Sequence, residues 1–185
     1  MLFRSNTSTG AYTYTPNATA INALTANASD SFTFSVSDGA GGSATQSFTV
    51  NITGVNDTPT LSAVTAGSLT DTAANDSFSN ITGTLSGADR DSGQTLTYGI
   101  SGGTVSAGTS TLAGTYGSLS LNTSTGAYTY TPNATAINAL TANASDSFTF
   151  SVSDGAGGSA TQSFTVNITG VNDTPTLSEI GRAHV

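Results

Sequence analysis

Cysteine and lysine are absent from this sequence, and its single histidine and single methionine lie at its ends, as His184 and Met1. Without a thiol, an amine or an imidazole in the body of the chain, the usual routes to an activated nucleophile are closed, and so are metal sites built on nitrogen or sulfur. A carboxylate pair for glycoside hydrolysis could come only from Asp89 and Asp91, which are neighbouring loop positions flanking an arginine. We therefore expect no enzymatic activity from this chain.

Positive charge is also scarce. The chain has three basic residues against eleven acidic ones, a formal net charge of −8. Nucleic-acid binding and attraction to anionic lipid both need clustered lysine and arginine, so both are excluded for this fragment. No run approaches the roughly 18 apolar residues of a membrane span. So acidic a chain favours a salty or calcium-rich medium, in which cations screen its self-repulsion.

The strongest pattern is an internal repeat. Residues 6–62 recur without change as residues 122–178, an identity of 57 residues at a spacing of 116. One DNA string, GAG ATC GGA AGA G, encodes Glu-Ile-Gly-Arg, and its reverse complement encodes Leu-Phe-Arg-Ser. Leu-Phe-Arg-Ser precedes the first copy of the repeat, and Glu-Ile-Gly-Arg follows the second copy. The DNA string resembles a sequencing-library adapter. We therefore interpret residues 1–5 and 179–185 as non-native tails and exclude them from the predicted fold.

Apolar and polar residues alternate along much of residues 63–178, which is typical of half-buried antiparallel strands. A glycine-rich hairpin turn is expected at 154–158, and 133–140 has the character of one short helical turn. The predicted strands span residues 81–85, 96–100, 117–121, 127–131, 148–152 and 160–168. This pattern predicts an all-β fold, a Greek-key Ig/cadherin-like β-sandwich.

The repeat also sets the predicted domain boundaries. Residues 63–178 form one complete repeat, residues 6–55 are the C-terminal half of a preceding repeat, and residues 56–62 are a linker. Apolar faces in the half-repeat, including those of Phe32, Phe34, Phe48 and Val50, lack the partner sheet of the missing half. We expect this half to be poorly packed or to depend on borrowed contacts, because exposed strand edges invite pairing.

Four ordered motifs carry a family resemblance that spans nearly the whole unit. They are Gly-Thr-Tyr-Gly-Ser-Leu-Ser-Leu-Asn at 114–122, Gly-Ala-Tyr-Thr-Tyr-Thr-Pro-Asn at 126–133, Asp-Ser-Phe-Thr-Phe-Ser-Val-Ser-Asp-Gly at 146–155 and Ile-Thr-Gly-Val-Asn-Asp-Thr-Pro at 168–175. Together they resemble the VCBS repeat, which is similar in build to cadherin-like and bacterial Ig-like domains. Such repeats occur in tandem in very large secreted or cell-surface bacterial proteins, often adhesins exported by type I secretion. The resemblance implies an extracellular spacer, or stalk, whose partners are neighbouring repeats of the same chain.

Asp89 and Asp91 flank Arg90 in a loop that ends in glycine. This spacing lets both carboxylates face one hard cation, and calcium prefers six to eight oxygen ligands. By resemblance, cadherin-like modules pair such a loop with an Asx-rich linker, here Asn56 and Asp57. We therefore predict a junction Ca²⁺ site of Asn56, Asp57, Asp89 and Asp91. The alternative is an aspartate-rich turn whose charges are solvated and partly offset by Arg90.

Asn172 and Asp173 repeat the linker pair and give a predicted half site for the same ion. Their alternative role is an Asx turn before Pro175. Asp38 and Asp154, each of which opens an Asp-Gly turn, are further candidate ligands, although turn chemistry alone accounts for them.

Two other functions remain open from the sequence. Tyr98, Tyr116, Tyr128 and Tyr130 could stack on sugars, which would make each unit a carbohydrate- or surface-binding module acting by avidity. A cluster of exposed aromatic side chains on one face would favour this function, whereas a featureless polar surface favours the spacer. The second alternative is an accessory repeat of a secreted toxin or enzyme whose catalytic domain lies outside this fragment.

Overall fold

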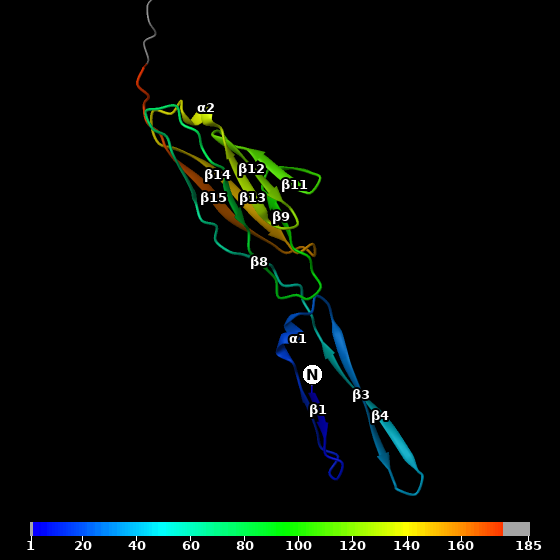
Figure 1. Ribbon diagram of the computed structural model, residues 1–185. Helices are drawn as coiled ribbons and strands as arrows, with labels where there is room; N and C mark the ends of the chain where they lie inside the picture. The colour runs from blue at the N-terminus through cyan, green and yellow to red at the C-terminus, as the bar shows by residue number, and fades with distance from the viewer. Residues whose placement is uncertain (1, 176–185) are drawn as a thin grey trace, which may run out of the picture.

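A computed structural model describes residues 2–175 of the chain. It contains two all-β bodies placed end to end, which we call the half-unit, residues 2–55, and the complete unit, residues 56–175 (Figure 1). No helix in the described part of the chain is long and apolar enough to cross a membrane. The predicted tail at 179–185 lies outside the described residues.

The complete unit is a β-sandwich. One sheet has the strand order β10 (Thr104–Ser106), β11 (Thr109–Ala113), β12 (Gly117–Asn122), β13 (Ala127–Pro132) and β7 (Ile81–Thr84). The other has the order β6 (Gly67–Thr70), β15 (Ser159–Thr169), β14 (Ala144–Ser153) and β9 (Thr97–Ile100), and β5 (Thr60–Leu61) pairs separately with β8 (Gly87–Ala88). The chain changes sheet four times, between β6 and β7, β7 and β9, β9 and β10, and β13 and β14. The predicted all-β, Greek-key sandwich is confirmed.

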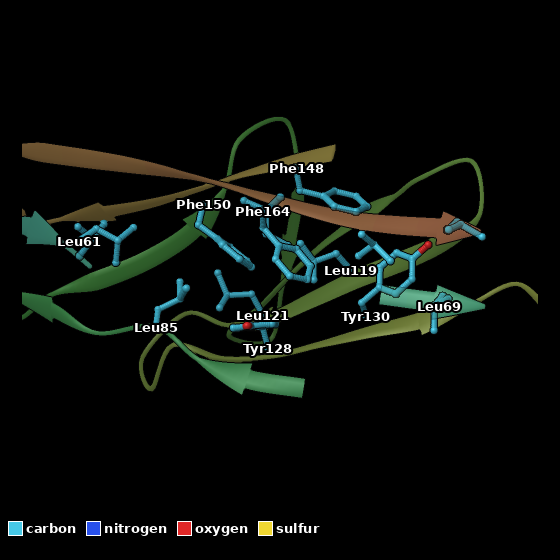
Figure 2. Close-up of a cluster of buried hydrophobic side chains, with 14 of the residues drawn as sticks. Leu61, Leu69, Leu85, Leu119, Leu121, Tyr128, Tyr130, Phe148, Phe150 and Phe164 are labelled. Atoms are coloured by element: carbon cyan, nitrogen blue, oxygen red, sulfur yellow. The ribbon is translucent and has the colours of Figure 1, made fainter. Parts of the chain in front are cut away.

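Alternating side chains from both sheets form the core. Figure 2 shows Phe148, Phe150 and Phe164 reaching from one sheet toward Tyr128 and Tyr130 of the other. The rings of Phe150 and Phe164 lie 5.5 Å apart, and both side chains are 0% exposed. Full burial of such a side chain contributes about 1.5–3 kcal/mol. The period-2 pattern therefore identified the inward face of these strands correctly.

One short helix bridges the two sheets after β13. This helix, α2 (Ala134–Ile137), begins where the side chain of Asn133 accepts a hydrogen bond from the backbone N–H of Ala136 at 3.3 Å. Asparagine is a favoured residue at this capping position. Ile137 is 0% exposed and anchors the turn in the core. The prediction of a single helical turn in this segment is confirmed.

The half-unit has the same local structure, but only one two-stranded sheet forms its second layer. Its elements are β1 (Leu2–Ser5), β2 (Tyr12–Thr15), α1 (Ala18–Asn22), β3 (Ala28–Ser37) and β4 (Ser43–Ile52), which give two separate two-stranded sheets. Phe32 lies opposite Phe48, just as Phe148 lies opposite Phe164 in the complete unit. Among residues 2–55 only Ile52 is buried. The low burial is what the missing sheet predicts.

The N-terminal tail takes part in this half-unit, and excluding it from the fold was wrong. Strand β1 pairs with β2, and Phe3 lies opposite Tyr14 as Leu119 lies opposite Tyr130. The ring of Phe3 stacks on that of Phe32 at 4.5 Å. The position needs an extended, apolar residue, and the tail supplies one whatever its origin. That the tail is non-native stays a prediction.

Candidate functional site

Asn56 ties the linker to two loops of the complete unit. Its side-chain Nδ2 donates to Oδ2 of Asp154 at 2.8 Å and to the backbone carbonyl of Asp57 at 3.1 Å. Its Oδ1 accepts a hydrogen bond from Nε2 of Gln94. A single amide therefore connects the β14–β15 turn, the loop before β9 and the linker itself.

The structure brings all four predicted site residues together. The backbone N–H of Asp57 donates to Oδ2 of Asp91 at 2.6 Å, and the N–H of Asp91 donates to Oδ1 of Asp89 at 3.0 Å. Asn56 adjoins them through its bond to the carbonyl of Asp57. Asp91 is only 8% exposed, so the alternative of a freely solvated aspartate turn does not describe this carboxylate.

Three side-chain oxygens at this junction are buried without a hydrogen-bond partner. They are Asp89 Oδ2, Asp91 Oδ1 and Gln94 Oε1. A buried oxygen that loses water without gaining a donor costs roughly 1–3 kcal/mol, and more if it is charged. All three are hard oxygen donors of the kind that calcium accepts, so the residues present fit that ion.

The acidic ligands are nevertheless few. Among residues 2–175 no three aspartate, glutamate, histidine or cysteine side chains gather closely enough to hold a metal ion. An ion here would have to share its coordination between carboxylates and the amide oxygens of Asn56 or Gln94. The chemistry of the set fits a hard cation such as calcium and gives transition metals no nitrogen or sulfur ligand.

Asp154 shows what the junction adds to an ordinary turn. Its Oδ1 accepts from the backbone N–H of Ala156 at 2.7 Å and of Gly158 at 2.9 Å, which closes the turn between β14 and β15. The hydrogen bond from Asn56, followed by these backbone amides, lowers the pKa of Asp154. Asp38, its identical counterpart in the half-unit, has a pKa lowered by backbone amides alone. Turn closure and junction binding therefore coexist at Asp154.

Replacing Asn56 by alanine is expected to raise the pKa of Asp154, because the hydrogen bond from Asn56 is the largest cause of its lowered value. Ionised Asp154 stabilises the junction above its ordinary pKa of 3.8, and this stabilisation is lost as the pH falls through the lowered value of the folded state. Carbon-13 titration of the carboxyl groups measures the pKa values of Asp154 and Asp38. The variant Asp38→Asn identifies which signal belongs to Asp38. A pKa of Asp154 that does not move in Asn56→Ala would contradict the contact.

The rest of the linker packs against the complete unit. Pro59 is fully buried, and a Cβ placed on Gly158 would come within 2.8 Å of its Cδ. Nε2 of Gln162 donates to the carbonyl of Leu61 at 3.3 Å. From the other side of the joint, the carbonyl of Ala23 accepts from the backbone N–H of Ser92 at 3.2 Å. The predicted linker is therefore partly a strand of the complete unit, and a backbone hydrogen bond crosses the joint to the half-unit.

The predicted half site at the other end is exposed. Asn172 donates from Nδ2 to the carbonyl of Asp173 at 3.4 Å, and both residues are exposed. Beside them Asp71 is 1% exposed, its Oδ2 accepts from the N–H of Val171 at 3.2 Å, and its Oδ1 has no partner. Sequence reasoning missed Asp71, because only the parallel pairing of β6 with β15 brings it to this end.

The tyrosines do not form an exposed sugar-stacking face. Tyr128 and Tyr130 are 8% and 0% exposed, and the half-buried Tyr98 and Tyr116 pack against the same core. A surface hollow lined by residues of β12, β13 and the start of α2 contains no aromatic side chain. The carbohydrate-binding alternative therefore loses the residues on which it was based.

Comparison with known proteins gives two family matches. The model of the bacterial cadherin-like domain matches residues 56–170, and that of a bacterial Ig domain matches residues 3–51. Among solved structures, extracellular cadherin domains 3–6 of protocadherin gamma B2 are similar at 16% identity and a TM-score of 0.44, covering 90% of this chain and 38% of that one. Drosophila N-cadherin EC1–4 is similar at 14% identity and a TM-score of 0.37, covering 68% and 28%. The chain thus spans well under half of either structure, and no curated protein sequence matches it.

Proposed function

The chain belongs to the bacterial cadherin-like domain family, and from this premise we propose that it is a structural spacer in the stalk of a large secreted or cell-surface bacterial adhesin. The residue motifs support the finer assignment to VCBS repeats, with the extracellular location and type I secretion that this resemblance implies. We propose no enzymatic activity for the chain.

The observation that carries this proposal is the linker, which is held against the complete unit and leaves little free chain at the joint. A spacer transmits position only if consecutive units cannot swing freely, since loosely joined domains move independently by default. Here Asn56 bonds to Asp154, Pro59 is buried and Ser92 reaches Ala23 across the joint. Near-identity between neighbours suits a module whose role is length and stiffness.

We further propose that calcium stiffens this joint. Asp89 and Asp91 would hold the ion, with amide oxygens of Asn56 or Gln94. The backbone N–H of Asp57 in the linker, which donates to Asp91, would hold that carboxylate in place. Bound calcium supplies positive charge that offsets the buried carboxylates. At the far end Asp71, Asn172 and Asp173 would provide the corresponding ligands for a following unit. The small acidic set fits a dissociation constant on the order of 10⁻⁴–10⁻³ M, as in extracellular calcium modules.

Calcium titration of a protein with two complete units in tandem tests the proposal. At an ion concentration tenfold above the dissociation constant, binding stabilises by about 1.4 kcal/mol, so the melting temperature should rise and X-ray scattering should report a longer, better-defined particle. In the present chain, Asp91→Asn should abolish the rise, whereas Asp173→Asn, in the isolated half site, should leave it unchanged. No change in melting temperature or particle length up to 10 mM calcium, about tenfold above the weakest expected dissociation constant, would remove the ion and leave the spacer function standing.

A further inference from the structure

The complete unit covers the whole inner face of its β14–β15 pair, whereas the half-unit covers the matching β3–β4 face only in part, with the rings of Phe3 and Tyr12. Strands β3 and β4 have the same sequence and register as β14 and β15. Val152 is 0% exposed, but its identical counterpart Val36 is 68% exposed. In the complete unit β9 pairs with the outer edge of β14, and β6 with that of β15. Within the described residues, β3 and β4 pair only with each other.

The complete unit shows what fits this face. Residues 63–121 contribute β6, β7, β9 and β12, which together cover residues 122–170. Because residues 6–62 are identical to residues 122–178, the same segment has the same complementary surface in the half-unit. We propose that residues 63–121 can close on the half-unit of their own chain, forming a circularly permuted sandwich in place of the resident one.

The linker is long enough for this exchange. In the complete unit β15 and β6 run parallel, with Val166 opposite Gly67. After exchange Gly67 would therefore lie beside Val50, which is three residues before Thr53. The gap to be closed is about three strand residues plus one interstrand spacing, roughly 10–15 Å. The thirteen residues 54–66 can extend to about 40 Å.

Several contacts favour the resident arrangement, in which residues 63–121 cover residues 122–170. Exchange separates β5 from β8, because the linker must turn back toward β4, and it breaks the bond from Asn56 to Asp154. It also requires β12 to displace β1 from β2. Leu61 leaves the core with β5, and the other core contacts are made by identical residues. Exchange therefore becomes dominant when the core of residues 122–170 is disabled.

The double substitution Phe150→Asp with Phe164→Asp disables that core in the full chain. We expect a single cooperative melting transition to remain, at a lower temperature, in a monomer. Amide hydrogen exchange should show protection moving to residues 28–52, and the altered masses of the substituted half make the two copies distinguishable. Adding Phe34→Asp and Phe48→Asp should abolish the transition. Complete unfolding of the first variant would overturn the proposal, and so would a dimer, in which a second copy supplies the segment.

A disulfide trap tests the exchange with the core intact. Ser151 and Gly99 are paired across β14 and β9, so Ser151→Cys with Gly99→Cys should cross-link rapidly in the resident arrangement. Ser35→Cys with Gly99→Cys can form an intramolecular bridge only after exchange, since paired Cα atoms lie at about 4.5–5.5 Å. We expect slow, intramolecular bridging that accelerates at least tenfold in the Phe150→Asp, Phe164→Asp background. No bridging in that background would contradict the exchange, as would bridging found only between chains.

Discussion

Replacing Phe150 by alanine is expected to destabilise the chain by about 3–5 kcal/mol, whereas the same change at Phe34 should cost less than about 1 kcal/mol. The two residues occupy identical sequence surroundings. Phe150 is 0% exposed and packs against Tyr128 and Phe164, with ring distances of 5.0 and 5.5 Å. Phe34 is half-buried in a half-unit whose only opposing layer is the two-stranded β1–β2 sheet. The difference between the two losses in unfolding free energy measures how much a complete opposing sheet stabilises one phenylalanine, because the neighbouring residues in sequence are the same for both.

Urea denaturation followed by tyrosine fluorescence measures both free energies of unfolding. The pair is its own control, because helix and strand propensities and unfolded-state effects are nearly the same for the two substitutions. Similar losses at Phe34 and Phe150 would mean that the half-unit is packed as well as the complete unit. That result is incompatible with the burial of the two copies.

Removing the carboxylate of Asp146 is expected to cost about 3 kcal/mol or more, because several buried donors would lose their acceptor together. Asp146 is 5% exposed and accepts from the N–H groups of Thr115 and Tyr116 at 2.9 and 3.0 Å. It also accepts from the hydroxyl of Tyr130 at 2.7 Å. Burial, and then this bond, hold the pKa of Tyr130 well above its usual range. Asp146 thus fastens the loop between β11 and β12 to both sheets.

The matched variant Asp30→Ala should have a much smaller effect. Asp30 is half-buried, and its bond to Tyr14 is longer, at 3.1 Å. A double-mutant cycle of Asp146→Ala with Tyr130→Phe should give a coupling free energy of about 1–3 kcal/mol in the complete unit. Chemical denaturation at pH 7 measures the free energy of unfolding of the four proteins in the cycle: the unchanged chain, the two single variants and the double variant. A coupling near zero would show that the short hydroxyl bond does not contribute to stability.

Strand positions were predictable wherever one face of a strand is apolar. Phe148, Phe150 and Val152 alternate with small polar residues, so both their strand and their inward face could be inferred from period alone. Strands β6, β10 and β11 were not predicted, because Ser, Thr and Gly dominate them and a short polar strand gives no periodic signal. Their pairing is decided by neighbouring strands rather than by their own residues.

The candidate site was predictable in part for a similar reason. Asp89 and Asp91 could be predicted from their local spacing, and Asn56 and Asp57 from the repetition of the linker. Gln94, Asp71 and the bond from Asn56 to Asp154 depend on residues far apart in sequence meeting at a joint. No local sequence pattern distinguishes Gln94 or Asp71 from an ordinary polar surface residue, and none indicates that Asn56 bonds to Asp154.

The N-terminal tail was excluded from the predicted fold because its sequence does not belong to the repeat, but its residues nevertheless form a strand. A segment foreign to the repeat can still occupy a strand position if its residues alternate suitably. Phe3 meets that requirement at the place that Leu119 occupies in the complete unit. The lesson is that an open strand edge recruits whatever extended chain lies beside it.

Amide hydrogen exchange followed by mass spectrometry tests the central claim most directly, namely that one sequence here exists in a closed and an open environment. Peptides cut from within residues 6–62 and 122–178 have identical masses, so each reports both copies at once. We predict two isotope envelopes of equal intensity for peptides covering β3, β4 and their counterparts β14 and β15. The protected envelope would belong to the complete unit and the fast-exchanging one to the half-unit. A single envelope would mean that both copies share one environment, which would contradict this account.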